Sequence, residues 1–450
     1  MNIKIHPDAE ANFNSKSEEL LLLIAPHVGE EPRDTFPSEI FIKHTITEKE
    51  LIGRMAHSLV DFKGNEVARF FEYKGKSVGL KNDAYKAYSK LCEAIQRTSS
   101  LSDTVSLTTV KKIVFEWLQG RYEGSINASL LSFAIPQIES KIQPLEILIP
   151  IYSLMIQSGF SVGRVKFQPI TGALIDEWQS KMVVGRSEEQ KARMTEYVQH
   201  ERIKIQGLAA GILTITAEKE RAGQIALEEV ERMLNLLRFW EPVNLHPALI
   251  SHCAILGKQN QQTTNYYVFE NSILSSSTAS IFDKGYRPWK IDNGFIGVIQ
   301  QDGLSVINDI LSNDKRTILQ RTIIDTLQLY SKCGLSVDYS DKLLYLLVTL
   351  ESLLLKGSSE PIQQNVGERM AFALSPNRLV RMKIVSNFKQ VYDLRSKFLH
   401  HGNDVESVHV DALQEFMLNV WNCLRLVIHS HNKFQTREQL IEAIDNVKFA

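Results

Sequence analysis

The chain has 450 residues, of which 44% are hydrophobic and 23% are charged, and its formal net charge is −1. This length exceeds the size at which one hydrophobic core keeps growing, so the sequence predicts two or three domains. The near-zero charge excludes a sequence-independent nucleic-acid coat protein, which would be strongly basic, so any polyanion must be met by a local patch.

Cysteine usage and the first residues indicate the compartment. Four cysteines are scattered, without a CxxC pair or histidines at zinc-finger spacing: Cys92, Cys253, Cys333 and Cys423. This pattern favours free, buried thiols in a reducing cytosol. Met1 to Ala11 is polar and acidic, unlike a signal peptide, and the apolar run from Leu20 to Ala25 is too short to span a bilayer. We therefore expect a cytoplasmic protein with no membrane partner.

The chain as a whole predicts a multidomain α+β protein. Residues 1–125 mix helical patterns, such as Leu107 to Leu118, with short extended pieces. Gly75-Lys76-Ser77 resembles the end of a phosphate-binding loop, but Phe70 stands where that motif requires glycine, so the motif is excluded. This first region is therefore expected to be mixed and mostly helical.

Residues 126–302 predict a separate α+β domain, for which a sensing role is a hypothesis. A long amphipathic helix is expected from Ala217 to about Trp240, and the charged stretch from Ser187 to Arg193 is expected to be a loop or short helix. The remaining apolar, β-branched segments predict strands at Leu145–Tyr152, Phe160–Phe167, Ile203–Ile215, Leu249–Leu256, Asn265–Phe269 and Phe295–Ile299.

Residues 303–433 predict an antiparallel bundle of four helices, and residues 434–450 a short terminal helix. Ser312 or Asn313 is expected to cap the first helix, and Asn377 the third, which ends near His401 before Gly402. Of the four expected bundle helices, the first ends near Cys333 and the third near His401, whereas the second covers Leu343–Leu355 and the fourth covers Val408–His429. The terminal helix covers Thr436–Val447.

The end of the third bundle helix carries the candidate chemistry. Arg395 and His400 lie five residues apart, or about 140° around a straight helix, so they meet only if the last turn unwinds or a second copy faces the first. His400 and His401 lie at the negative end of the helix dipole, which favours the imidazolium by ~0.3–1 kcal/mol. A fixed guanidinium beside a titratable imidazole suits phosphoryl chemistry.

The same helix is basic along its length. Six basic residues stand against Asp393 alone, which leaves an excess of five positive charges: Arg378, Arg381, Lys383, Lys389, Arg395 and Lys397. On a nearly neutral protein this pattern predicts a face that attracts phosphate, with Lys397, Lys389 and Arg381 as substrate-binding residues. The alternative is an ordinary solvated helix surface.

The preceding helix adds one buried charge. The segment from Leu343 to Leu355 is apolar nearly all round, and Glu351 is the charge within it. A carboxylate in such a helix must be paired or neutralised, which predicts Arg395, or alternatively Arg369, as its partner. The other interpretation is that Glu351 reaches solvent at the helix edge.

These residues resemble a known family. Arg395-Ser396 followed by His400, a glycine just beyond, the Leu350-Glu351-x-Leu353 helix and the following amphipathic helix are similar to the HEPN domain. The closest form is the Apea-like type of prokaryotic antiphage proteins. The resemblance covers about residues 305 to 432, and the region from Ile149 to Phe167 is similar in style to sequences upstream of such domains.

The resemblance implies a metal-independent endoribonuclease that needs no cofactor and works as a homodimer, with both R-x4-6-H motifs in one cleft. His400 would act as general base or acid on the RNA 2′-hydroxyl, Arg395 would stabilise the phosphorane and Ser396 would orient phosphate or imidazole. The products would carry a 2′,3′-cyclic phosphate and a 5′-hydroxyl, and DNA would not be cut. His401 also fits the motif, but the family spacing favours His400. The expected role is antiphage defence, with tRNA or host transcripts as targets.

Two other classes of function are weighed against this one. A non-catalytic HEPN module would bind a nucleotide, RNA or a protein partner, with Arg395 and Glu351 serving to lock the bundle. A metal hydrolase in the middle domain lacks a ligand cluster, because His246 and His252 have no carboxylate at ligand spacing. The sequence therefore predicts no metal site.

Overall fold

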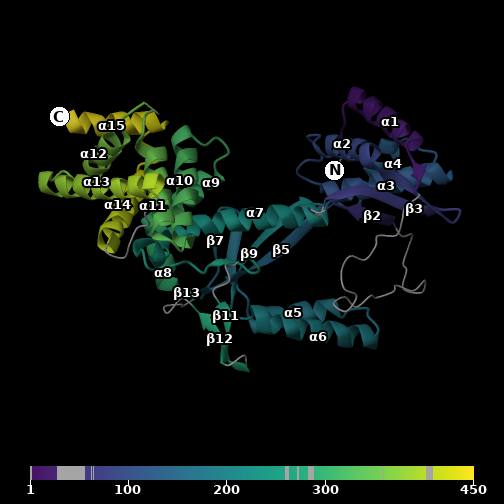
Figure 1. The fold of residues 1–450 in the computed structure, drawn as a ribbon, viewed down its shortest axis with the longest axis horizontal. Coiled ribbons are helices and arrows are strands. Elements are labelled where there is room, and N and C mark those ends of the chain that lie inside the picture. Colours follow the sequence, from purple (N-terminus) through teal and green to yellow (C-terminus); the bar gives the residue numbers. More distant parts are fainter. Residues whose placement is uncertain are drawn as a thin grey trace. The chain divides into compact units, whose positions relative to one another are not determined.

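The structure is a computed structural model that describes residues 3–27, 56–61, 63, 65–258, 263–270, 273–281, 288–357, 359–401 and 409–449, with the backbone alone at 56–57, 263–270, 273–281, 399–401 and 449. It is a mixed α+β protein with sheets in its N-terminal and middle parts and helices in its C-terminal part (Figure 1), as predicted. Two compact units form: Met1–Ile147 with Thr214–Ile225, and Leu148–Leu213 with Ala226–Ala450. Strands β5 and β9 and helix α7 contribute residues to both units.

The first unit packs helices against an antiparallel sheet whose strand order is β1-β4-β3-β2. Its strands are β1 (Ala25–Pro26), β2 (Ala56–Val60), β3 (Glu66–Tyr73) and β4 (Lys76–Lys81). Its helices are α1 (Pro7–Leu22), α2 (Asn82–Gln96), α3 (Leu107–Glu123) and α4 (Leu130–Glu139). Ser106 caps α3, because its side chain accepts a hydrogen bond from the amide of Thr109.

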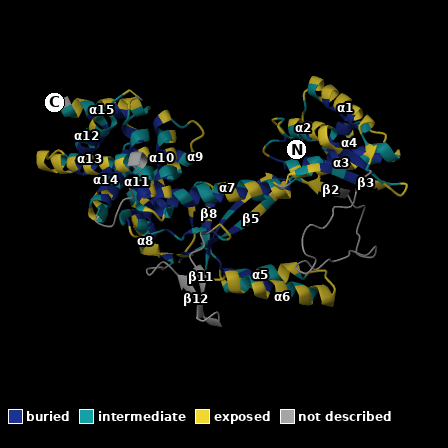
Figure 2. Cartoon of the chain, viewed as in Figure 1, coloured by how far each residue is buried: buried dark blue, intermediate teal, exposed yellow. Residues whose placement is uncertain are grey.

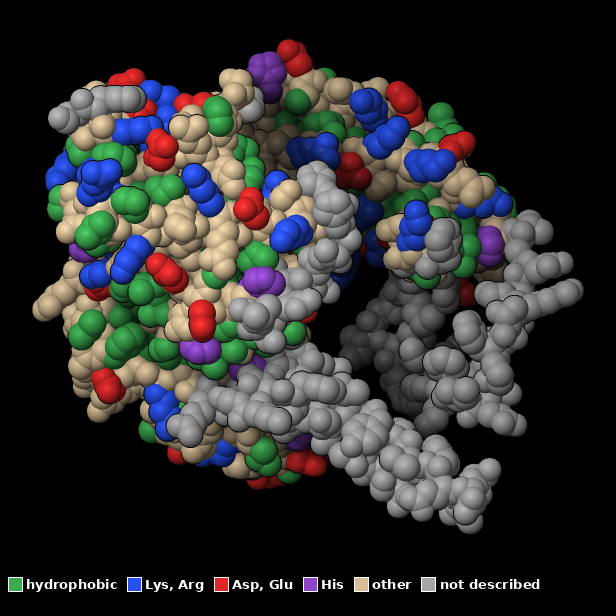
Figure 3. Space-filling model, turned by 60° about the vertical axis from the view of Figure 1, so that its left-hand side comes forward, with side chains coloured by type: hydrophobic (Ala, Val, Ile, Leu, Met, Phe, Trp, Pro, Cys, Tyr) green, Lys and Arg blue, Asp and Glu red, His purple; other side chains and the backbone are tan. Residues whose placement is uncertain are grey.

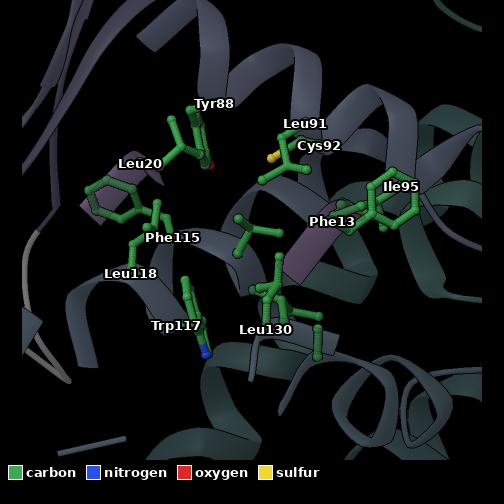
Figure 4. Packing of buried hydrophobic residues seen from close by; sticks show 14 of the residues in the cluster. Phe13, Leu20, Tyr88, Leu91, Cys92, Ile95, Phe115, Trp117, Leu118 and Leu130 are labelled. Carbon is green, nitrogen blue, oxygen red and sulfur yellow. The ribbon is translucent and has the colours of Figure 1, made fainter. Parts of the chain in front are cut away.

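Aliphatic and large aromatic residues together fill the core of this unit (Figure 4). Trp117 and Tyr88 are fully buried, and each still satisfies its polar group. Trp117 Nε1 donates to the Ala128 carbonyl at 2.9 Å, and the Tyr88 hydroxyl donates to the Lys111 carbonyl at 2.5 Å. These bonds tie α2, α3 and the start of α4 into one core.

The middle part is built on a five-stranded sheet of order β10-β5-β9-β8-β7. Its strands are β5 (Gln143–Tyr152), β7 (Phe160–Val162), β8 (Val165–Pro169), β9 (Ala209–Ala217) and β10 (Ala254–Ile255). Helix α7 (Lys219–Leu237) packs on β9 at Gly211, where a Cβ atom would lie 2.8 Å from Val230 Cγ1, so this close approach requires glycine. Beside the sheet, β6 (Leu154–Ile156) pairs in parallel with β13 (Trp289–Ile291), and β11 (Thr263–Glu270) pairs antiparallel with β12 (Ile273–Ile281).

Two helices form a hairpin beside this sheet, α5 (Gly172–Met182) and α6 (Glu188–Ile205). Both are mostly exposed (Figure 2), and their buried residues are Ile175, Val198 and Ile205. The stretch from Ser187 to Arg193 therefore begins a long helix, with Ser187 and Gln190 forming a capping box.

Two strand predictions in this region are wrong. Ile203–Ile205 ends α6, and β9 begins at Ala209 after a turn in which Gly207 has a φ of +87°. Phe295–Ile299 belongs to helix α8 (Asn293–Ile299), because Asp292 accepts a hydrogen bond from the Phe295 amide at 2.8 Å and starts a helix there. In both places a local cap or turn residue decides against the β-branched composition.

The C-terminal part is helical and contains more helices than predicted. Its elements are α9 (Ser305–Ser312), α10 (Ile318–Leu335), α11 (Tyr339–Leu354), α12 (Ile362–Leu374), α13 (Arg378–His401), α14 (Val410–His429) and α15 (Arg437–Phe449). The sequence analysis missed α12. The predicted cap at Ser312 or Asn313 is also wrong, because Asn313 follows the end of α9 and Thr317 caps α10 through a capping box with Gln320.

Helix α14 is fixed to the turn that follows α7. That turn consists of η2 (Arg238–Trp240) and η3 (Pro242–Leu245). The Trp421 ring stacks on Phe239 at 5.7 Å between centroids, and Trp421 Nε1 donates to the Phe239 carbonyl at 3.1 Å. Arg425 pairs with Asp302, which also accepts a hydrogen bond from Trp240 Nε1 at 3.0 Å. The middle sheet region and the C-terminal helices therefore share one polar and aromatic junction.

Two buried charged residues, Arg238 and Glu241, lie beside this junction. Arg238 and Glu241 are 2% and 5% exposed, Arg238 Nε donates to the Cys253 carbonyl at 2.9 Å, and Ser251 Oγ donates to Glu241 Oε2 at 2.6 Å. Burial raises the pKa of Glu241 to about 7, although the Ser251 hydrogen bond and Arg238 oppose that rise. The folded protein therefore holds a proton on this carboxyl more tightly than the unfolded chain does.

This shift predicts a pH-dependent loss of stability that Glu241→Gln removes. The raised pKa stabilises the folded state fully below the unfolded pKa of Glu241, 4.5, and the stabilisation is lost as pH rises through about 7. Relative to Glu241→Gln, we expect the wild-type free energy of unfolding to fall by about 3 kcal/mol between about pH 4 and about pH 8. Urea unfolding of both proteins across this range measures the difference, and parallel curves would contradict the assignment.

Candidate functional site

Helix α13 carries most of the candidate residues, and its start is set locally. Asn377 Oδ1 accepts hydrogen bonds from the amides of Leu379 at 2.8 Å and Val380 at 3.3 Å, which confirms Asn377 as the cap. The buried side of the helix consists of Ile384, Phe388, Val391 and Leu394. The opposite side, which includes the basic residues Lys383 and Lys389, faces solvent.

Arg395 lies at the edge between these two sides and is half-buried. Its guanidinium carbon is 5.6 Å from the centroid of the Tyr392 ring, one turn earlier on the same helix. Ser396 is also half-buried, whereas Lys397 is exposed. Arg395 is therefore held against the bundle rather than extended freely into solvent.

Glu351 approaches Arg395 from α11, which packs against α13. The carboxylate is half-buried; burial raises its pKa, and the charge of Arg395 acts in the opposite direction. The alternative partner, Arg369, is engaged elsewhere: it bonds to Glu360 and Asp445 and donates to the Leu354 carbonyl at 2.9 Å. Glu351 therefore lies within electrostatic reach of Arg395, although these two described side chains form no direct ion pair.

The remaining motif residues are described in part. The backbone of α13 continues through His400 and His401, whose side chains lie outside the described residues, as does Gly402. Eleven residues advance an α-helix by about three full turns, so the backbone position of His400 lies on the same side of α13 as Lys389 and Arg378. Arg395 lies about 140° away from position 400 around the helix axis, as the spacing predicts.

Two of the predicted substrate-binding residues share a groove. Arg381 and Lys389 line a hollow of about 660 Å³ between α12, α13 and α15, which is described further below. Lys397 is not part of its lining. The sequence analysis counted Arg378 among the basic residues without assigning it a role, and it missed Lys448, which reaches the groove from a helix far along the chain.

The wider surface carries both signs of charge. On the face drawn in Figure 3, Lys and Arg side chains are interspersed with Asp and Glu side chains, as expected for a chain with a net charge of −1. A polyanion would therefore meet a local basic site rather than a uniformly positive face.

Within the described residues, neither the cysteines nor the possible metal ligands form a second candidate site beside the one around Arg395. Cys92, Cys253, Cys333 and Cys423 are free and buried, as predicted, and burial raises the pKa of the Cys423 thiol to about 12. Among the residues that the structure describes, no three His, Cys, Asp or Glu side chains gather as a metal site would require. In the same part of the chain no helix combines the length and apolar character needed to cross a bilayer.

Comparisons with protein-family models, curated proteins and solved structures found no match to this chain.

Proposed function

We propose that this chain is a metal-independent endoribonuclease of the HEPN type that cuts RNA with Arg395 and His400. The observation that carries the proposal is the position of Arg395, half-buried beside Glu351 and Tyr392 on the same helix that reaches His400. A guanidinium that lies over an aromatic ring and near a carboxylate is oriented before substrate arrives, which is what electrostatic stabilisation of a transition state requires.

The proposed reaction uses the ribose itself as the nucleophile. His400 takes the proton of the 2′-hydroxyl, and the 2′-oxygen attacks the adjacent phosphorus. Arg395 stabilises the extra negative charge of the phosphorane, and Ser396 orients the phosphate or the imidazole. The bond to the 5′-oxygen then breaks, and that oxygen takes up a proton. The products are a 2′,3′-cyclic phosphate and a 5′-hydroxyl.

The proposal includes a homodimer formed through the C-terminal helices. Because positions 395 and 400 point about 140° apart on one helix, a second chain would supply the partner motif that completes the cleft. His401 is the alternative base. The proposed setting is the cytoplasm, where the protein would act as a toxin-like effector in antiphage defence on tRNA or host transcripts; this setting rests on the HEPN resemblance alone.

The first test compares RNA and DNA of one sequence in excess EDTA. We expect the purified full-length protein to cut the RNA and to leave the DNA intact, because DNA lacks the 2′-hydroxyl nucleophile. Cleavage of both strands, or cleavage of RNA that EDTA abolishes, would contradict the proposed chemistry.

A second candidate function follows from the same contacts. Arg395 packs on Tyr392 and lies near Glu351 within one chain, and such an arginine could serve to lock α11 to α13 in a non-catalytic module that binds a nucleotide, RNA or a protein. The two functions differ in assembly. A solution-scattering measurement that shows a monomer at working concentration favours the binding module, whereas a dimer with RNA cleavage favours the nuclease.

A further inference from the structure

A groove runs between α12, α13 and α15 at the N-terminal end of α13. Its volume is about 660 Å³. It is lined by Glu368 and Phe372 from α12, by Lys448 from α15, and by Arg378, Arg381, Met382, Val385, Ser386 and Lys389 from α13. Residues from three helices therefore form one concave surface.

The cations of this groove are mostly free of carboxylates. Lys448 forms an ion pair with Glu368. Within the described part of the chain, Arg378, Arg381 and Lys389 have no carboxylate partner. Arg369, one turn before Phe372 on α12, contrasts with them because two carboxylates hold it. The lining of the groove thus carries an excess of three positive charges that no carboxylate among the described residues pairs with.

The groove also offers apolar surface between its cations. The Arg381 guanidinium lies over the Phe372 ring, 4.1 Å from the ring centroid. Met382 in the lining is 58% exposed, and the neighbouring Leu379 is 69% exposed. Cations that alternate with aromatic and aliphatic surface match a single-stranded nucleic acid, whose phosphates and flat bases need both. A peptide made of acidic residues alone would use the cations but has no flat groups for Phe372 and Met382.

The groove leads along α13 toward the candidate active site. Arg378 and Lys389 are eleven residues apart, or about 16 Å along the helix axis, and they lie on one side of it. A further eleven residues on the same side reach the position of His400. A strand several nucleotides long that follows this side of α13 would therefore run from the groove to the proposed general base.

We infer that the groove between α12, α13 and α15 binds the phosphate backbone of single-stranded RNA on one flank of the cleavage site. This inference rests on the proposed ribonuclease function and adds to it a flanking subsite several nucleotides from the cut. The contacts to phosphate are Arg378, Arg381 and Lys389, and Phe372 with Met382 supplies the apolar floor.

The test measures binding without cleavage. Full-length protein is titrated into a fluorescein-labelled 12-nucleotide RNA, fully 2′-O-methylated so that no nucleophile is present, and anisotropy is read at two salt concentrations. We expect Arg378→Glu with Lys389→Glu to weaken binding by at least about 10-fold and to lower the salt-dependence slope by about 1.4, because each lost phosphate contact contributes about 0.7. Lys383→Glu is the matched control, since Lys383 is exposed on α13 but does not line the groove.

The possible results distinguish a failure of the RNA-binding groove from a failure of the proposed ribonuclease function. Equal weakening by Lys383→Glu, or unchanged binding in the double variant, would overturn the groove assignment. Competition by poly-glutamate as strong as that by RNA of equal charge would also overturn it, in favour of an acidic protein partner. Arg378→Gln with Lys389→Gln, which adds no negative charge, should show a smaller loss in the same direction. Groove-dependent binding without any RNA cleavage by the wild type would refute the proposed function and leave the RNA-binding groove standing.

Discussion

Arg395→Ala is expected to lower the single-turnover rate of RNA cleavage in EDTA by about 10²–10³-fold, the usual cost of removing one preorganised group that stabilises a transition state. Arg395→Lys should lose nearly as much, because an ammonium cannot donate two parallel hydrogen bonds to a phosphorane. Since Arg395 also packs on Tyr392 and lies near Glu351, circular dichroism and thermal unfolding of each variant accompany the rates. Lys383→Ala, on the same helix, serves as the control and should cleave as the wild type does.

His400→Ala is the companion variant, with an expected loss of about 10²–10⁴-fold for a missing general acid–base group. His401→Ala should retain most of the activity. If His401→Ala is inactive while His400→Ala is active, His401 is the base and the R-x4-H spacing is wrong. Undiminished cleavage by both Arg395→Ala and His400→Ala would remove the catalytic assignment altogether.

Arg369→Ala is expected to destabilise the C-terminal helices by about 3–5 kcal/mol, the typical cost of removing one partner from a buried ion pair. Arg369 is 5% exposed, and its guanidinium donates to Glu360 at 2.8 and 2.9 Å and to Asp445 at 2.9 and 3.1 Å. The substitution would remove the cation between Glu360 and Asp445, leave Asp445 with Lys356 alone at 3.6 Å, and loosen both α15 and the segment before α12. Hydrogen exchange over Arg437–Phe449, together with urea unfolding, measures the effect.

Arg378→Ala is the matched control for this prediction, because Arg378 is exposed and should change stability by no more than about 0.5 kcal/mol. The pH dependence gives a second check. The Arg369 hydrogen bond lowers the pKa of Glu360 to about 2, so this pair stabilises the folded state above the ordinary carboxyl pKa and loses that effect as pH falls toward 2. Equal stability of Arg369→Ala and wild type at neutral pH would contradict the role of this network.

The parts of the fold that the sequence predicted are those that neighbouring residues decide. Asn377 starts α13 through contacts two and three residues away. Glu351, the charge on a nearly apolar stretch of helix, indicated that a cation would lie near it, and Arg395 does lie within reach of its charge, without a direct ion pair between these two described side chains. Each of these predictions depends on a short stretch of chain. In each case an unsatisfied polar or charged group would cost so much free energy that few arrangements of the neighbouring residues are possible.

The parts that escaped prediction depend on residues far apart in the sequence. Helix α12 begins at Ile362, continues with three polar residues and buries a narrow side that includes Val366 and Met370, so its helical periodicity in the sequence is weak. Arg369 bonds to Asp445, 76 residues later, and no local pattern marks that pair. The groove likewise needs Lys448 beside α13, which only the packing of α15 on α12 provides. Tertiary contacts of this kind leave no trace in spacing or composition.

The most direct test of the nuclease proposal is end-group analysis of RNA from cells that express the wild type or Arg395→Ala. The proposed reaction predicts new fragments with 2′,3′-cyclic phosphate and 5′-hydroxyl ends in the wild-type sample, and their loss in the Arg395→Ala sample. Fragments with 3′-hydroxyl and 5′-phosphate ends, or the same cyclic-phosphate fragments in both samples, would contradict cleavage by Arg395 and His400.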